Sequence, residues 1–269
     1  MFFKAMRTGI LLLLTFFTMS CSEYAKVLKS SDIEMKYKKA VEYYDEGEYS
    51  KALSIFDELG TLFRGTSRSE IVHYYIANCH FNLNDNYFAG YYYKNYAKTY
   101  PNSPKAEECL YKSAYCSYLN SPTASLDQSE TEQAIDEFQL FLNRFPNSEL
   151  KDSTNAMITV LRGKLEQKAY DNAKLYYQME NYKSATVALK NMLKEFPESP
   201  HREEIEFLLV KSSYLLAANS IDSKKEERYN ETIESYHKFV DNYGESSKFI
   251  KQAETYYSNA LRELDKMKF

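Results

Sequence analysis

Tryptophan is absent from this sequence, and glycine and proline are scarce. Among its 269 residues are 7 glycines and 6 prolines, well below their usual share of roughly 12%. β-Rich architectures need many turns, so this shortage argues against them, and against collagen-like or Pro/Gly-rich disordered chains. The composition therefore predicts a folded, mostly helical protein.

Long charge runs and enzyme motifs are also missing. The formal net charge is −4, with both signs mixed along the chain, so no basic stripe points to nucleic acid. No GxSxG, GxGxxG or HExxH pattern occurs, and the four histidines are dispersed at His73, His80, His201 and His237. We expect no catalytic residues, no bound metal and no cofactor other than a covalent lipid.

The N-terminus differs from the rest of the chain. Lys4 and Arg7 precede an apolar stretch at residues 10–19, which is too short to span a bilayer but typical of a secretory signal. With Cys21 directly after Ser20, the segment resembles a bacterial lipoprotein signal, although Thr18 stands where that family prefers an aliphatic residue. The resemblance implies a signal peptide over residues 1–20, palmitate or other acyl chains on Cys21, and a tether over residues 21–30. The alternative is an ordinary signal peptide with an incidental cysteine.

Three cysteines remain after this segment, at Cys79, Cys109 and Cys116. An odd number cannot pair completely, and the spacing is not that of a disulfide framework. We expect buried free thiols, with a disulfide from Cys79 to Cys109 or Cys116 as the alternative.

A repeat runs through residues 31–269. The tetrad Tyr-x-x-Ala recurs along it, and six copies occupy one repeat position, with the tyrosine at Tyr37, Tyr74, Tyr111, Tyr170, Tyr214 and Tyr257. An aromatic-Pro-x-Ser ending follows at residues 100–103, 145–148 and 196–199, and residues 243–246 form a fourth copy with glycine for proline. Alanines stand twelve residues before the three prolines, at Ala89, Ala134 and Ala185.

This pattern resembles the tetratricopeptide repeat, in which small residues let paired helices approach closely and a proline ends the second helix. It predicts an all-α solenoid of five helix pairs plus a C-terminal capping helix near residues 247–267. Ser-x-x-Glu segments predict helix starts by the capping-box pattern at Ser31, Ser67, Ser129 and Ser223. The longer loops at 120–128 and 219–227 are either partner contacts or solvated surface.

Tyrosine, present 26 times, also forms a stripe. A second aromatic lies seven residues, or two helical turns, after each tetrad tyrosine of the first units, so each pair shares a helix face. We define the aromatic stripe as the first three of these pairs: Tyr37, Tyr44, Tyr74, Phe81, Tyr111 and Tyr118. Its rings either bind an extended peptide in a groove or fill space between successive helices.

Taken together, the lipoprotein signal, the five helix pairs and the repeated endings resemble the BamD (YfiO-like) family of outer-membrane assembly lipoproteins. The resemblance implies a non-enzymatic scaffold, lipid-anchored on the periplasmic face of the outer membrane. It implies binding to a BamA-like β-barrel insertase and other subunits of the assembly machinery, and help in receiving and inserting unfolded outer-membrane proteins. The alternative is a tetratricopeptide lipoprotein that serves as a scaffold for cell-wall or cell-division proteins.

Overall fold

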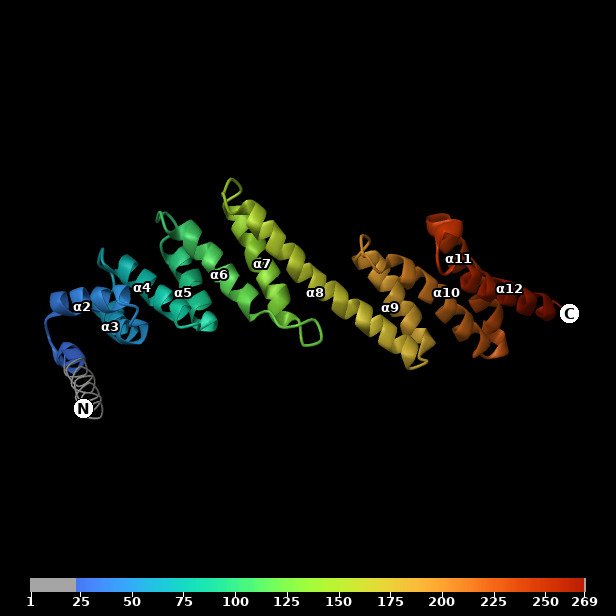
Figure 1. Ribbon diagram of the computed structural model, residues 1–269, viewed down its shortest axis with the longest axis horizontal. Coiled ribbons are helices and arrows are strands. Elements are labelled where there is room, and N and C mark those ends of the chain that lie inside the picture. The colour runs from blue at the N-terminus through green and yellow to red at the C-terminus, as the bar shows by residue number, and fades with distance from the viewer. Residues whose placement is uncertain (1–22, 269) are drawn as a thin grey trace, which may run out of the picture. The chain divides into compact units, whose positions relative to one another are not determined.

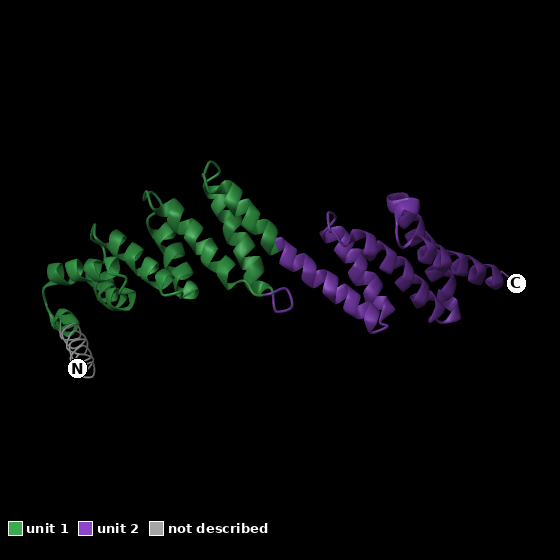
Figure 2. Ribbon diagram, in the orientation of Figure 1, with its two compact units in different colours: residues 1–122, 128–161 green, residues 123–127, 162–269 purple. Residues whose placement is uncertain are grey.

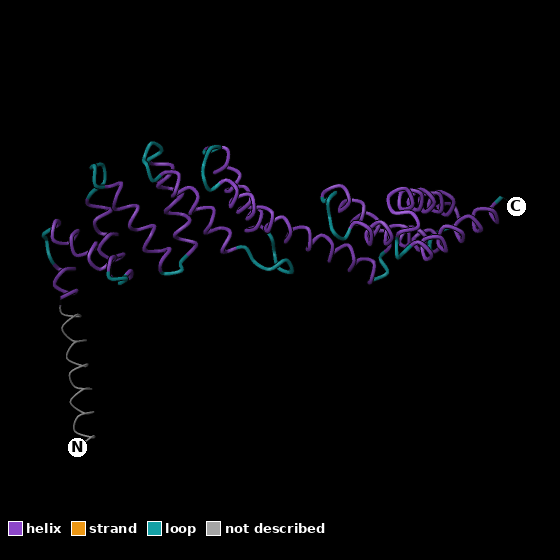
Figure 3. The backbone as a smooth tube through the Cα atoms, turned by 45° about the horizontal axis from the view of Figure 1, so that its top comes forward, coloured by secondary structure: helices purple, strands orange, loops and turns teal. Residues whose placement is uncertain are grey.

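The computed structural model describes residues 23–268, and over this range it contains helices and loops but no strand (Figure 3). This outcome confirms the all-α prediction. The helices run in the order α2 (Ile33–Asp45), α3 (Tyr49–Leu62), α4 (Ser69–Asn82), α5 (Asn86–Thr99), α6 (Ala106–Asn120), α7 (Ser129–Arg144), α8 (Lys151–Gln178), α9 (Tyr182–Glu195), α10 (Arg202–Ala218), α11 (Asp222–Tyr243), the 3-10 turn η1 (Gly244–Ser246) and α12 (Ile250–Met267) (Figure 1).

The chain divides into two compact units (Figure 2). Unit 1 comprises residues 1–122 and 128–161, and unit 2 comprises residues 123–127 and 162–269. Helices that are consecutive in the chain pack against each other from α2 through α7 in unit 1 and from α9 through α12 in unit 2. The predicted series of five pairs, α2/α3, α4/α5, α6/α7, α8/α9 and α10/α11, with a last helix α12, is confirmed.

Small residues lie where paired helices meet, as the repeat predicts. The alanines of the tetrads and their partners on the second helices are all at most 1% exposed. With only alanine or, once, threonine at these points, two helix backbones can approach closely and bury the larger side chains beside them. The set is Ala40, Ala52, Ala77, Ala89, Ala114, Ala134, Ala173, Ala185, Ala217, Thr232 and Ala260.

The repeated serine has a defined task in the turn between helix pairs. In each of the first three endings its Oγ accepts a hydrogen bond from the backbone N–H two residues later, at 3.1 Å, in an ST-turn that leads into the next helix. In the fourth ending, η1 moves this task one residue along, so Ser247 and not Ser246 accepts from Phe249, at 3.0 Å.

The turn inside a helix pair needs a left-handed residue. Gly47, Asn84 and Glu180 occupy the same position of their pairs, with φ of +79°, +60° and +59°. Glycine adopts this conformation without a penalty and asparagine tolerates it, whereas a glutamate is strained there. The glutamate at position 180 shows that the surrounding pair is stable enough to hold it.

The predicted capping boxes are wrong in register. No serine caps a helix at the four predicted starts, because α2 is capped by Asp32, and α4, α7 and α11 begin after Arg68, Gln128 and Ile221 without a side-chain cap. The helices that do have a side-chain cap use Asp32, Asp85 and Asn181, each accepting from the backbone N–H three residues later. At α2 the aspartate one residue after the predicted serine supplies the cap, and at the other three starts no side chain does.

Helix α8 explains the irregular repeat spacing. It is 28 residues long, twice the 14 residues of α3, α4, α5 and α9. Its first part supplies Ile158 and Leu161 to a cluster in unit 1, and its last part supplies Tyr170 and Ala173 to a cluster in unit 2. One helix therefore closes one set of repeats and opens the next.

The predicted tether lies only partly within the described residues. Cys21 and the predicted signal peptide lie outside them, whereas residues 23–29 are helical. Val27 is buried in the first core cluster, Tyr24 packs edge-on against Tyr43, and Glu23 pairs with Lys39 at 2.7 Å. Along residues 23–268, no helix is both long and apolar enough to cross a membrane.

Candidate functional site

The aromatic stripe lies on α2, α4 and α6, the first helices of the three pairs in unit 1. All six of its side chains are half-buried. Each one contacts aromatic rings of its own or a neighbouring helix: Tyr37 lies edge-on to Phe56 at 6.5 Å, and Tyr118 lies 6.3 Å from Phe138. The stripe therefore contributes to packing between helices and still presents part of each ring to solvent.

Two further tyrosines join these pairs into one continuous surface. Tyr75 lies 4.9 Å from Tyr44 on α2 and stacks on Phe56 of α3, with ring centroids 4.7 Å apart. Tyr115 lies 6.4 Å from Phe81 of α4 and stacks between Tyr111 and Tyr118 at 6.2 and 6.0 Å. We call the stripe plus Tyr75 and Tyr115 the aromatic row. Both added residues escaped the sequence analysis, although Tyr115 stands one helical turn after Tyr111 and so shares its face.

A polar network fixes the centre of the row. The Tyr74 hydroxyl donates to Glu108 at 2.8 Å, and Lys112 pairs with the same carboxylate at 2.7 Å. Lys112 also donates to Asn78 at 3.1 Å, and the buried Tyr93 hydroxyl donates to that amide oxygen at 2.7 Å. Because these residues belong to α4, α5 and α6, the network ties one helix pair to the next.

Cations lie against the rings of the same region. The Lys105 ammonium lies 4.0 Å from the centroid of Tyr74, and Lys112 lies within 6 Å of the rings of Tyr74, Phe81 and Tyr93. Such cation–π contacts contribute about 0.5–1 kcal/mol each at exposed sites and more when desolvated. They hold the ring faces in place and leave a positive potential beside them.

The hydroxyls of Tyr44 and Tyr74 are hydrogen-bond donors at neutral pH. Burial raises the pKa of Tyr44 to about 12, and burial together with the Glu108 carboxylate raises the pKa of Tyr74 further. For Glu108 burial alone would raise the pKa, but the hydrogen bonds from Lys112 and Tyr74 outweigh it, so its pKa lies below the ordinary 4.5. The pair at physiological pH is therefore a phenol donating to a carboxylate.

Unit 2 repeats this arrangement. Lys174 donates to the Tyr170 hydroxyl at 2.9 Å and to Glu204 at 3.1 Å, and His201 stacks on the Tyr170 ring with centroids 4.1 Å apart. The glutamate follows its tyrosine by 34 positions in both units, as Glu108 follows Tyr74. At these two repeats the tetrad tyrosine therefore joins its helix to the first helix of the next pair.

The three cysteines are free and buried, as predicted. They are fully shielded from solvent, and burial raises the pKa of each thiol to about 12. No cluster of three or more His, Cys, Asp or Glu side chains that could hold a metal ion occurs in the part of the chain that the structure describes.

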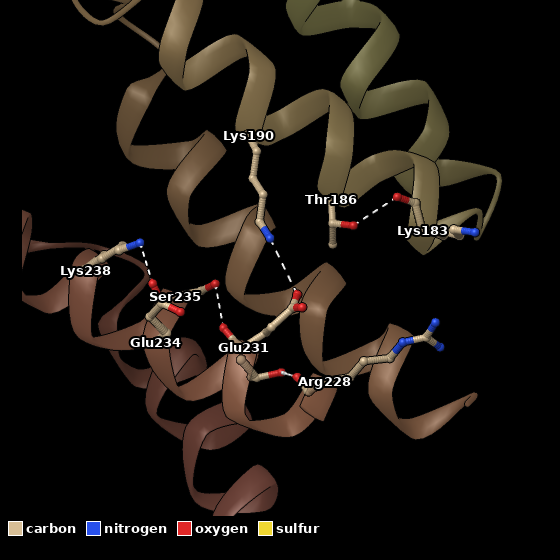
Figure 4. A network of polar contacts seen from close by, with 9 residues as sticks. Lys183, Thr186, Lys190, Arg228, Glu231, Glu234, Ser235 and Lys238 are labelled. Carbon is tan, nitrogen blue, oxygen red and sulfur yellow. Dashed lines mark hydrogen bonds and ion pairs between the residues drawn. The ribbon is translucent and has the colours of Figure 1, made fainter. Parts of the chain in front are cut away.

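Figure 4 shows the polar contacts of α9 and α11, where Thr186 and Ser235 are buried and the charged pairs are exposed. Among the contacts drawn in Figure 4, the ion pair of Lys190 with Glu231 is the one that joins α9 to α11. Its nitrogen–oxygen distance is 3.5 Å, and both side chains are about half exposed. The neighbouring pair Lys238–Glu234 lies within α11, and Ser235 donates to the backbone of its own helix. Exposed pairs of this kind contribute about 0–1 kcal/mol, and their solvated geometry marks no binding site.

Comparison with known proteins identifies the family of this chain. The family model YfiO, described as outer membrane lipoprotein, matches residues 30–204 and 162–266, and the second match starts where unit 2 resumes at residue 162. The outer membrane protein assembly factor BamD of Caulobacter vibrioides is 22% identical over 195 residues, which cover 72% of this chain and 63% of that protein's length. The crystal structure of the P58(IPK) TPR domain aligns with a TM-score of 0.41 and 13% identity, over 90% of this chain and 68% of the other. Because the family matches span nearly all of the described residues, the chain belongs to the YfiO family of outer membrane lipoproteins.

Proposed function

We propose that this protein is a lipid-anchored scaffold of the β-barrel assembly machinery on the periplasmic face of the outer membrane. The observation that carries the proposal is the family match over residues 30–266, supported by the similarity to an assembly factor. Cys21 would carry the lipid, and the protein would need no other cofactor. It would act by binding and positioning its partners and not by catalysis.

The aromatic row is the proposed receiving surface for unfolded outer-membrane proteins. An extended segment projects every second side chain toward the surface on which it lies. Half-exposed rings on α2, α4 and α6 offer apolar area at low entropic cost, and the Tyr118 hydroxyl, which has no partner within the described residues, can donate to an unpaired peptide backbone. Since the hydrogen bond to Glu108 fixes the Tyr74 ring beforehand, little freedom of that side chain is lost on binding.

The helix pairs of unit 2 are the proposed docking region for a BamA-like insertase and other subunits of the machinery. Repeat architectures supply extended surfaces of this kind because each pair stacks on its neighbours. Receiving and docking would then use different units of one chain.

Depletion of the protein followed by an outer-membrane proteome tests this proposal. We expect a selective loss of β-barrel proteins, while lipoproteins of the same membrane stay at their normal level. An intact β-barrel profile with aberrant division or cell-wall defects would instead support the alternative scaffold function.

A peptide titration tests the receiving surface. The probe is a fluorescent peptide that copies the C-terminal strand of a β-barrel protein. Tyr115→Ser removes the ring that joins Phe81 to Tyr111 and Tyr118, and we expect it to weaken binding roughly tenfold, the usual cost of losing an aromatic anchor. Tyr176→Ser, on a 41% exposed tyrosine of α8, is the matched control. Equal affinity of the Tyr115 variant and the unaltered chain would refute the role of the row.

A further inference from the structure

Helix α5 carries a second set of aromatic side chains that the core does not use. Tyr87, Phe88 and Tyr91 are 75%, 50% and 59% exposed, whereas Tyr93 and Tyr96 on the other side of the helix are buried. Three adjacent exposed aromatics are more than the scattered single residues of an ordinary surface. They belong to α5, whereas the aromatic row belongs to α2, α4 and α6.

A groove of about 250 Å³ lies beside these rings, within unit 1. Tyr87 and Tyr91 line it from α5, Ser113 and Ser117 from α6, and Glu130 and Glu137 from α7. Gly90 lies in this wall as well: a Cβ there would come within 3.2 Å of Cys116, so glycine lets α5 and α6 approach closely. The groove is smaller than the 300–1,000 Å³ typical of small-molecule sites, so it fits one side chain of a partner.

The charges around the groove favour a basic side chain. Glu137 is 8% exposed and already satisfied, because it bonds to Lys94 at 2.9 Å, Ser117 at 2.7 Å and Gln133 at 3.2 Å. Glu130 is exposed and makes no ion pair within residues 23–268. Lys94, the cation that lines the groove, thus pairs with Glu137, and the carboxylate of Glu130 is left as one unbalanced negative charge.

A second unbalanced carboxylate flanks the other side of the aromatic face. His80 stacks on Phe88 and Tyr92 at 5.5 and 5.0 Å and pairs with Asp85 at 3.1 Å. Asp57 of α3 interacts electrostatically with His80 and Tyr92 but makes no ion pair within the described part of the chain. Asp57 is therefore associated with the His80, Phe88 and Tyr92 rings, whereas Glu130 lines the groove together with Tyr87 and Tyr91.

We propose that this face is a docking surface for a protein segment that places an arginine side chain between Tyr87 and Tyr91, with Glu130 as its ion-pair partner. Guanidinium groups stack on aromatic faces, bind carboxylates in a bidentate manner and are more weakly hydrated than ammonium groups. Exposed tyrosines around an unpaired carboxylate supply both interactions at once. Phe88 adds apolar area at the edge of the contact.

A direct binding measurement on the full chain tests this assignment. The probe is a fluorescein-labelled peptide of alternating glycine and arginine, followed by anisotropy, beside a citrulline version of equal size and no charge. We expect the arginine peptide to bind and the citrulline peptide to bind at least tenfold more weakly. Tyr87→Ser with Tyr91→Ser, and separately Glu130→Lys, should each weaken arginine binding at least fivefold.

Three controls establish whether the arginine peptide binds at this face of α5. The altered side chains are exposed, so far-UV circular dichroism should not change, and Tyr176→Ser on α8 should bind as the unaltered chain does. Failure of the arginine peptide to bind, or binding to both α5 variants with the affinity of the unaltered chain, would overturn the proposal. So would a sedimentation experiment in which the chain self-associates and the Tyr87/Tyr91 variant does not, because the occupant would then be a second copy. Neither result bears on the receiving surface, whose probe and variants differ.

Discussion

The contact between Tyr74 and Glu108 decides how strongly the aromatic row is bound into the fold. Tyr74→Phe keeps the ring but removes the hydroxyl that donates to Glu108 at 2.8 Å. Hydrogen bonds to charged groups contribute about 1.5–3 kcal/mol, and the 39% exposure of the Glu108 side chain places this one near the lower limit. We therefore expect Tyr74→Phe to lower the free energy of unfolding by about 1.5 kcal/mol.

A double-mutant cycle isolates the pair. Glu108→Gln also weakens the contact with Lys112, but the coupling between Tyr74→Phe and Glu108→Gln should still reach about 1 kcal/mol in urea unfolding at pH 7. Tyr118→Phe is the matched control, because its hydroxyl makes no hydrogen bond within residues 23–268, and it should change stability by less than about 0.5 kcal/mol. The folded-state pKa of Glu108 is depressed, so the coupling should persist above pH 4.5 and disappear as the pH falls through that lowered pKa. Coupling within about 0.3 kcal/mol of zero at pH 7 would show that the tyrosine does not join the two repeats.

Other residues give sharp tests of the same structure. Burial raises the pKa of Cys79, Cys109 and Cys116 to about 12, so a thiol reagent at pH 8 should label them only after unfolding. These folded pKa values lie above the unfolded value of 9.0, so the unfolded thiols lose their protons first as the pH rises. The free energy of unfolding should therefore fall by up to about 1.4 kcal/mol per thiol and pH unit between pH 9 and 12. A urea unfolding midpoint that does not change over this pH range would contradict the burial of the thiols. Glu180→Gly should raise the free energy of unfolding by about 0.5–1 kcal/mol by relieving a left-handed residue, whereas Glu180→Ala, which keeps the strain, should not. Gly163→Ala should stabilise α8 by a similar amount, since nothing lies within 4 Å of an added Cβ, and a lower thermal midpoint would reveal a hidden constraint on that glycine. Cys21→Ser should abolish labelling with a palmitate analogue and move the protein to the soluble fraction; retained labelling would exclude Cys21 as the lipid site.

The local sequence predicted the helix pairs correctly, but it predicted the residues at which the helices start less well. Alanines at fixed offsets predict close helix approach because no other feature of these helices requires a small residue there, and all are buried. Helix starts depend on which nearby oxygen reaches the free N–H groups, and Asp32 wins over Ser31 because it lies one residue closer to the first turn. In the fourth ending the serine that accepts the hydrogen bond lies one residue later than in the other three. The 3-10 turn at residues 244–246 causes this change, and no residue pattern predicts that turn.

The sequence by itself determined the all-α class, the five helix pairs and the last helix, because each follows from spacing along the helices. It favoured three buried free thiols but left a disulfide from Cys79 open, and the structure shows that all three thiols are free. Only the tertiary structure decided that α8 serves two sets of repeats, that Tyr75 and Tyr115 complete the aromatic row, and that Tyr74 and Tyr170 each meet a glutamate 34 residues away. Those contacts join different helices, and periodicity fixes which face a residue occupies but not which neighbour that face meets. The groove beside α5 likewise could not be predicted from the sequence, because side chains of three helices, α5, α6 and α7, form it together.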